Sequence, residues 1–189
     1  MKSVIVFSIA LTVCACNLPS RKDIVNELNK ANKSAPVASV APKGWQYSYS
    51  IDRMTSDTEF AAEATSKDKL DFEFPYNGGS TATLYVIFKD HANYLGLKVS
   101  KGSFSFEDGI QNLRIRFDSE KAFTVKSGKL MDGGLNALGF YSADSLISKL
   151  KKSEKVLIEA AFYREGTRIM EFDAGKLVWR HKHVDAKAL

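Results

Sequence analysis

Apolar and polar side chains alternate with a period of two along much of this chain, and this pattern constrains its fold more than any other feature. The segments Lys69–Phe74, Leu95–Val99 and Leu113–Phe117 each place an apolar side chain at every second position. In the third segment Arg114 and Arg116 occupy the intervening positions. Successive side chains of a β-strand point to opposite faces, so the pattern predicts strands with one face in a core and the other in water.

The rest of the chain extends this interpretation to a mainly β domain. Thr81–Lys89 is partly apolar on both faces, which is typical of a central strand. Further strands are expected at about Lys121–Val125, Ala137–Tyr141, Lys155–Tyr163 and Thr167–Phe172, the last two joined across Arg164-Glu165-Gly166. Short strands separated by turn residues indicate an antiparallel β-sandwich, or a barrel, over residues 45–180, followed by a C-terminal tail at 181–189.

One short helix is expected among the strands. Ser142 is placed to cap it, Leu146, Ile147 and Leu150 share one face, and Lys149 lies in its last turn. Side-chain oxygens stabilise helix starts, and cations stabilise helix ends. We expect the helix to be a crossover between strands; a basic docking surface is the alternative.

The first fifteen residues have the character of an export signal. Lys2 precedes an apolar run from Val4 to Val13, which at about ten residues is too short for a membrane span of roughly 20. The run is followed by Val13-Cys14-Ala15-Cys16, which resembles the lipobox of bacterial lipoproteins. The resemblance implies cleavage after Ala15 and lipid attachment at Cys16. The competing frame, Leu11-Thr12-Val13-Cys14, places a bulky valine beside the cut.

An ordinary signal peptide cleaved before Cys16 is the alternative. Cys14 and Cys16 are the only cysteines, so cleavage would leave one thiol with no disulfide partner, an unfavourable state for an exported protein. Acylation consumes that thiol, and two or more acyl chains anchor a protein stably. Asn17 after the cysteine favours, by resemblance to bacterial sorting rules, the outer membrane facing the periplasm.

Residues 16–44 are expected to form a tether between the lipid and the domain. Ser20-Arg21-Lys22-Asp23 has the form of a capping box and predicts a short helix from about Lys22 to Asn32. Isolated helices of this length are rarely stable, so we expect a marginal helix within a linker rather than one lying on lipid or on the domain. Ser34–Pro42 consists of small residues and proline, which predicts an extended spacer.

The order of motifs in the domain resembles that of small exported bacterial β-sandwich proteins. The motifs are Trp45 at the start, Arg114-Ile115-Arg116-Phe117-Asp118, Lys149-Leu150-Lys151-Lys152 at the helix end, and Glu171-Phe172-Asp173. Many such proteins are uncharacterised lipoproteins. The chain resembles more loosely the VasI-type accessory proteins of type VI secretion loci and the invasion-associated locus B proteins. The resemblance implies an envelope binding or accessory role, secretion-associated in the VasI-type case, and implies no reaction.

No residue pattern in the sequence points to catalysis, and none implies a cofactor. The Gly-x-Ser-x-Gly elbow of many serine hydrolases is absent. Asp132-Gly133-Gly134 lacks the lysine of a phosphate-binding loop and predicts a turn. The acidic pairs Asp71/Glu73 and Glu171/Asp173 match the water-facing side of amphipathic strands. We therefore expect a non-enzymatic protein.

The three histidines do not form a recognisable metal site. His91 is expected in an exposed loop, and His181 and His183 in a solvated tail. A zinc or copper site needs three or four ligands, and only Asp185 lies near the His-x-His pair. The sequence thus predicts no bound metal.

The net charge indicates which partners to expect. The formal charge is +5, and it falls to +4 without residues 1–15, since Lys2 is the only charged residue among them. So mild a basic excess is typical of solubility, or of attraction to an anionic envelope surface, rather than of nucleic-acid binding.

Two functions remain open. In the first, the domain binds another envelope protein, and Arg114, Arg116, Arg164 and Arg168 are the outward residues expected to contact it, because arginine is enriched in binding hot spots. In the second, it binds a small lipid or glycan. The aromatic residues Trp45, Tyr47, Tyr49, Phe104 and Phe106 would then line a groove instead of filling the core, which is the commoner use of such residues.

Overall fold

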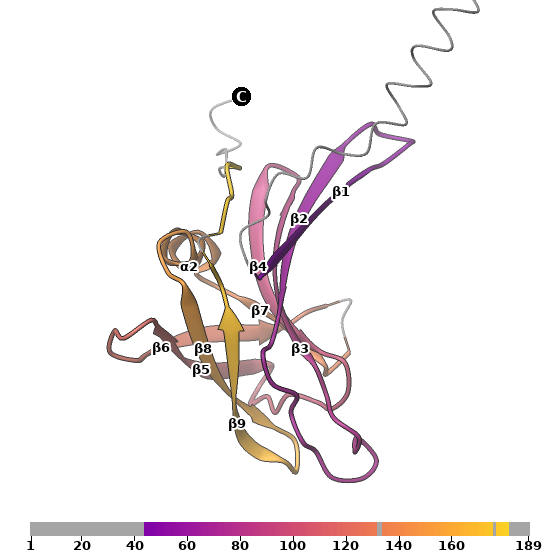
Figure 1. The fold of residues 1–189 in the computed structure, drawn as a ribbon. Helices are drawn as coiled ribbons and strands as arrows, with labels where there is room; N and C mark the ends of the chain where they lie inside the picture. The colour runs from indigo at the N-terminus through magenta and orange to yellow at the C-terminus, as the bar shows by residue number, and fades with distance from the viewer. Residues whose placement is uncertain (1–43, 132–133, 176, 182–189) are drawn as a thin grey trace, which may run out of the picture. The chain divides into compact units, whose positions relative to one another are not determined.

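The computed structural model describes residues 44–131, 134–175 and 177–181. The predicted signal peptide, Cys16, the tether as far as residue 43 and its helix lie outside the described residues, as do Asp132, His183 and Asp185. The described elements are shown in Figure 1: β1 (Trp45–Ile51), β2 (Thr58–Thr65), β3 (Ala82–Lys89), β4 (Ala92–Val99), β5 (Ile110–Phe117), β6 (Phe123–Lys129), β7 (Ala137–Phe140), α2 (Ala143–Leu150), β8 (Lys155–Phe162) and β9 (Gly166–Asp173).

All these strands belong to one antiparallel sheet in the order β1-β2-β3-β4-β7-β6-β5-β8-β9. The prediction of a mainly β domain with one short helix is confirmed. A sandwich consists of two separate sheets, whereas here the short strand β7 pairs with β4 on one side and with β6 on the other. Leu138 of β7 lies between Leu97 and Lys129 in this register. β7 thus joins the two halves of the chain into one continuous sheet.

The hydrophobic core packs against the inner face of this sheet. The alternation predicted for two of the strands is confirmed, because their apolar side chains are all buried: Leu95, Leu97 and Val99 in β4, and Leu113, Ile115 and Phe117 in β5. Full burial of one such side chain contributes about 1.5–3 kcal/mol. Both halves of the sheet contribute to the same core cluster, and they are therefore expected to unfold together.

The two ends of the sheet approach each other beside the core. Ser66, just after β2, forms an isolated bridge with Phe172 of β9. The next residue, Lys67, donates its backbone N–H to the carbonyl of Glu171 at 2.8 Å. At the start of β1, the indole N–H of Trp45 donates to the carbonyl of Ala174. The C-terminal end of β9 is therefore covered, although β9 is the last strand of the sheet.

The prediction of a strand at Lys69–Phe74 is wrong. Leu70 and Phe72 are buried as expected, but Phe74 is 87% exposed, and the segment belongs to no strand of the sheet. The N–H and C=O of Leu70 bond to Ser80 at 2.7 and 2.8 Å, which closes a loop. The N–H of Tyr76 then bonds to the carbonyl of Glu73 at 2.8 Å. The chain therefore turns before a third apolar side chain can reach the core.

The helix forms where the sequence predicts it. Leu146, Ile147 and Leu150 of α2 are buried, and the helix contacts β4. Ser142 occupies the N-cap position, but its hydroxyl makes no capping hydrogen bond. The expected side-chain cap is therefore not formed. No helix in the described parts of the chain has the length and hydropathy needed to cross a membrane.

Candidate functional site

Arg114 and Arg116 lie on the outer face of β5, as predicted. Both are exposed, and they alternate with the buried Leu113, Ile115 and Phe117. Cross-strand pairing places Glu159 of β8 opposite Arg114, and Arg114 Nη1 lies 2.9 Å from Glu159 Oε1. Exposed pairs of this kind contribute at most about 1 kcal/mol. Arg114 is thus an ion-paired surface residue.

The other two arginines are not part of this outer face. Arg164 lies in the β8–β9 turn, with its guanidinium 5.3 Å from the ring centre of Tyr163. Arg168 lies opposite Ala160, which is buried, so Arg168 shares the inner face of β9 with Met170. The prediction that Arg168 points outward is therefore wrong. The four arginines do not form one binding surface.

Arg168 instead has a structural role at the end of the core. Its Nη2 lies 3.5 Å from Glu165 Oε2, and the side chain of Glu165 is only 8% exposed. The other carboxylate oxygen of Glu165 accepts the backbone N–H of Glu73 at 3.0 Å. Glu165 therefore joins the β8–β9 turn to the loop that precedes β3, with Arg168 as its counter-ion.

A shallow hollow of about 160 Å³ lies beside Arg114 and Arg116, and is lined also by Leu157, Glu159 and Ile169. Ile169 is 61% exposed. A hollow of this size holds a single side chain rather than a ligand of drug size, which needs several hundred Å³.

In the part of the chain that the structure describes, the acids and histidines noted in the sequence are not grouped in one place. His91 is exposed in the turn between β3 and β4, as predicted. Glu171 is ion-paired with Lys155 and Lys67, and the hydrogen bond from Lys155 holds the pKa of Glu171 below its usual value. Among the residues that the structure describes, no three histidine, cysteine or acidic side chains are grouped as metal ligands.

His181 is not part of a solvated tail, which corrects the sequence prediction. Its ring stacks on Phe60 and Phe88, with centroid distances of 4.2 and 4.9 Å, and meets Trp179 edge-on at 4.9 Å. Burial, with a smaller contribution from Lys151, holds the pKa of His181 below its usual value. The imidazole therefore serves as a packed aromatic group.

A cluster of exposed apolar side chains lies around the β1–β2 hairpin. Sequence analysis named Tyr47 and Tyr49 as possible groove residues but did not predict their grouping with Ile51, Phe60 and His181. Tyr47, Tyr49 and Ile51 are 40%, 70% and 57% exposed. They share the strand face of buried Trp45, because they lie at every second position of β1. With Phe60 of β2 and His181 they form what we call the hairpin aromatic surface, and Val178 and Trp179 line the same small hollow of about 190 Å³.

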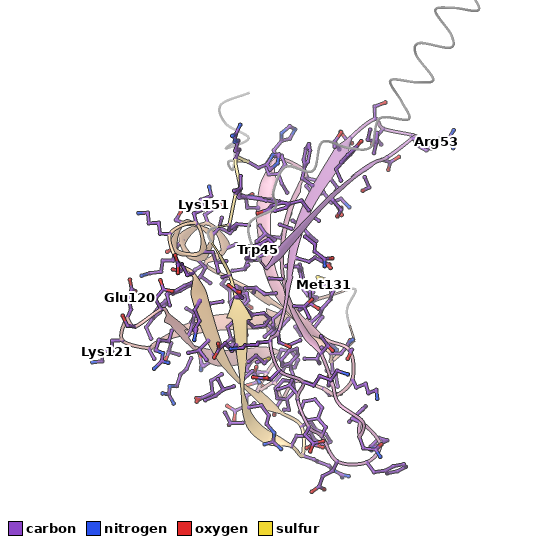
Figure 2. All side chains as sticks on the ribbon, in the orientation of Figure 1. Trp45, Arg53, Glu120, Lys121, Met131 and Lys151 are labelled. Atoms are coloured by element: carbon purple, nitrogen blue, oxygen red, sulfur yellow. The ribbon has the colours of Figure 1, made fainter. Side chains whose placement is uncertain are left out.

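Hydrogen bonds hold the C-terminal segment against this surface. The indole N–H of Trp179 donates to Asn93 Oδ1 at 2.9 Å, and the N–H of Val178 donates to the Tyr47 hydroxyl at 3.0 Å. Burial raises the pKa of Tyr47, so this hydroxyl stays neutral at ordinary pH. In Figure 2, Trp45 marks one end of β1 and Arg53 the tip of the hairpin at the other. The hairpin aromatic surface lies between them.

The aromatic residues proposed to line a ligand groove are divided between two environments. Trp45 and Phe104 are buried, and Phe106 packs partly buried against the core. Phe104 stacks on Phe162 with a centroid distance of 4.8 Å. These residues therefore fill the core, and only Tyr47 and Tyr49 are exposed.

A larger groove lies on the outer face over β4, β7 and β6. Its volume is about 540 Å³, and its lining includes Tyr85, Tyr94 and Tyr141. Gly96, Gly139 and Gly128 lie side by side on neighbouring strands in this region. A Cβ added to Gly96 would lie 2.1 Å from the Tyr85 ring, and one on Gly128 would lie 2.7 Å from the Tyr141 hydroxyl. The glycines thus let two tyrosines lie flat on the sheet.

Comparison with known proteins adds little to this geometry. No protein-family model matches the sequence, and no curated protein is significantly similar to it. Among solved structures, the crystal structure of invasion associated protein B from Bartonella henselae is similar, with a TM-score of 0.45 and 10% sequence identity. The match covers 70% of this chain and 86% of that one. At this similarity it assigns the chain neither to a family nor to a function.

Proposed function

We propose that this chain is a lipid-anchored bacterial envelope protein that binds another envelope protein through the hairpin aromatic surface and catalyses no reaction. The observation that carries the proposal is the exposure of Tyr47, Tyr49 and Ile51 on a single strand face. Contiguous exposed apolar side chains on a folded domain mark interaction sites more often than scattered ones do. Tyrosine is also enriched among the residues that dominate binding energy.

The surroundings of the hairpin aromatic surface resemble the polar rim of an interface. Lys89 and Glu59 form an ion pair at 3.8 Å, and Asp52, Arg53 and Asp57 lie at the hairpin tip. Binding hot spots are typically apolar or aromatic at the centre and polar at the edge. This arrangement favours the hairpin over Arg114, which is already ion-paired with Glu159.

The anchor is proposed from sequence alone. The lipobox-like Val13-Cys14-Ala15-Cys16 and the absence of a third cysteine support acylation of Cys16. Asn17 supports the outer membrane, with the domain in the periplasm. Mass spectrometry of the N-terminal peptide from membranes tests this directly. We expect an acylated peptide beginning at Cys16 in the wild type and none in Cys16→Ser; an unmodified mature thiol would contradict the anchor.

The partner is tested by crosslinking in intact cells, followed by detergent extraction and mass spectrometry. We compare the wild type with Tyr49→Asp and with a double variant, Arg114→Asp and Arg116→Asp. Tyr49 and the two arginines are exposed, so both variants are expected to fold. The proposal predicts a specific envelope protein that Tyr49→Asp loses and the arginine variant retains. Loss only in the arginine variant would place the interface on β5 instead.

A second candidate function, binding of a small glycan, is favoured by the groove over β4, β7 and β6. Its volume of about 540 Å³ falls in the range of ligand sites, and Tyr94 and Tyr141 are 51% and 67% exposed there. Exposed tyrosine rings offer flat apolar faces beside a polar hydroxyl. A glycan array tests this function. Binding that Tyr141→Ala abolishes and Tyr163→Ala preserves would establish it, and an array without signal would exclude it for the glycans tested.

A further inference from the structure

Strand β1 is an edge strand that lacks the charges and prolines that usually protect an edge. It pairs with β2 on one side, and no other described strand pairs with it on the other. Every residue of β1 after Trp45 is exposed, and the strand contains neither charge nor proline. Proteins commonly use charges, prolines or covering segments to stop edge strands from pairing. The open edge of β1 is therefore a template for another strand.

The opposite edge of the same sheet differs in these respects. β9 carries Arg168 and Glu171, and its last residues are engaged by Ser66 and Lys67. Charged side chains and local covering are the usual means of blocking an edge. Among the described residues, the sheet thus has one blocked edge, at β9, and one unpaired edge, at β1.

The hairpin register shows which main-chain groups of β1 face the open side. The N–H of Asp52 donates to the carbonyl of Asp57 at 2.8 Å, one position beyond the pair Ile51 and Thr58. Hydrogen-bonded and non-hydrogen-bonded pairs alternate along an antiparallel ladder. Even-numbered residues of β1 therefore bond to β2, and the N–H and C=O groups of Tyr47 and Tyr49 point to the open side.

We propose that β1 pairs antiparallel with β1 of a second copy of this chain, about a twofold axis at Ser48. This register pairs the exposed residues Gln46–Ser50 with the same residues of the second copy, since Ser48 is the middle residue of Trp45–Ile51 and only Trp45 is buried. It places Tyr47 opposite Tyr49 of the second copy, and both residues have free main-chain groups on that side. Each such pair exchanges two N–H···O=C bonds.

The self-pairing is complementary in side chains as well as in backbone. With no charged residue in β1, no like charges meet across the axis. The tyrosines of both copies fall on one face, where cross-strand aromatic pairs stabilise a sheet by about 0.2–1 kcal/mol each. The twofold arrangement also closes, as is usual for homodimers, so it does not propagate into fibres. A second copy is therefore the occupant that fits this edge.

Two cysteine variants test the register. Ser48 lies opposite its own copy in a non-hydrogen-bonded pair, where Cα atoms are about 4.5 Å apart, within the 4.4–6.8 Å that a disulfide requires. Ser50 lies opposite Gln46, so two Ser50 residues are offset by four positions, about 14 Å at 3.4 Å per residue. Both serines are exposed on the same strand face, which makes Ser50→Cys a matched control.

The full chain is extracted from membranes in detergent, oxidised at about 10 µM and resolved on a non-reducing gel. Paired thiols have effective concentrations of the order of 1 mM, so Ser48→Cys is expected to form dimers about 100-fold faster than Ser50→Cys. The wild-type chain is oxidised in parallel and shows how much dimer forms through Cys14 and Cys16 alone. Equal rates for the two variants, or faster dimerisation of Ser50→Cys, would overturn the proposal.

A main-chain variant provides the second test, by sedimentation of the same extracted chain. Both Tyr49→Pro and Tyr49→Ala remove the tyrosine ring. Tyr49→Pro also removes the backbone N–H that points to the open side, whereas Tyr49→Ala retains this N–H. We expect Tyr49→Pro to be monomeric and Tyr49→Ala to retain dimer; equal dimer content in the two variants would overturn the proposal. These tests concern the strand edge and need no other protein, so their failure would leave the proposed binding function intact.

Discussion

Introducing a single methyl group at Gly96 should destabilise the protein because the methyl group would clash with the side chain of Tyr85. A Cβ at this position would lie 2.1 Å from Cζ and 2.2 Å from the hydroxyl oxygen of Tyr85. Tyr85 is half-buried, and burial together with the carboxylate of Glu63 raises its pKa. Gly96→Ala therefore forces this ring off the sheet. Overpacking of this kind costs about 1–3 kcal/mol, whereas glycine-to-alanine replacement elsewhere gains about 0.4–1 kcal/mol from the unfolded chain.

The two effects separate in a double-mutant cycle measured by urea unfolding and tryptophan fluorescence. In the wild-type background we expect Gly96→Ala to lower the free energy of unfolding by about 1.3 kcal/mol, the difference between the midpoints of the two ranges. In a Tyr85→Ala background, Gly96→Ala should raise the free energy of unfolding by about 0.4–1 kcal/mol. Gly139→Ala is the control, because its nearest neighbour is Leu130 rather than Tyr85. Equal losses for Gly96→Ala in both backgrounds would refute the reasoning.

Three further predictions concern charged and titrating groups. Arg168→Ala should lower the free energy of unfolding by about 1 kcal/mol, because it leaves the carboxylate of Glu165 buried without its counter-ion; a loss no larger than that of the exposed control Arg164→Ala would contradict this. The pKa of Glu171 is lowered by Lys155, so its stabilising effect is present above the unfolded value of 4.5 and is lost as the pH falls through the lower folded value. Glu171→Gln should therefore flatten the decline of the urea midpoint below pH 4.5, and an unchanged decline would refute that role. The pKa of His181 is likewise lowered, so the stabilisation from its packing is lost as the pH falls below 6.5. In that pH range the fluorescence emission of Trp179 should shift to the red in the wild type but not in His181→Phe. Identical shifts in the two proteins would contradict this role of His181.

The strands that were predicted correctly are those whose buried face can be identified from the residues of the strand itself. In β4 and β5, large apolar side chains alternate with polar ones, so period two alone identifies the inner face. β2 carries alanines at its buried positions, Ala62 and Ala64, and these give a weak hydrophobic signal. Arg168 could have been assigned to the inner face, because it lies two residues before buried Met170.

The features that sequence analysis missed depend on contacts between distant segments. The closure of the loop at Leu70 requires Ser80, and the continuous sheet requires the four-residue strand β7. The hairpin aromatic surface arises because His181 stacks on Phe60, more than a hundred residues away in the chain. No local periodicity encodes such contacts. The sequence therefore left open whether Tyr47 and Tyr49 fill the core or line a groove, and the structure shows that both are exposed.

Site-specific photo-crosslinking in cells tests the central claim most directly. A photoreactive amino acid replaces Tyr49 in one strain and Tyr163 in another; these tyrosines are 70% and 58% exposed and lie on different hairpins. If the hairpin aromatic surface binds an envelope protein, position 49 should capture a specific protein that position 163 does not. Capture from position 163 alone, or of the same proteins from both positions, would contradict the account.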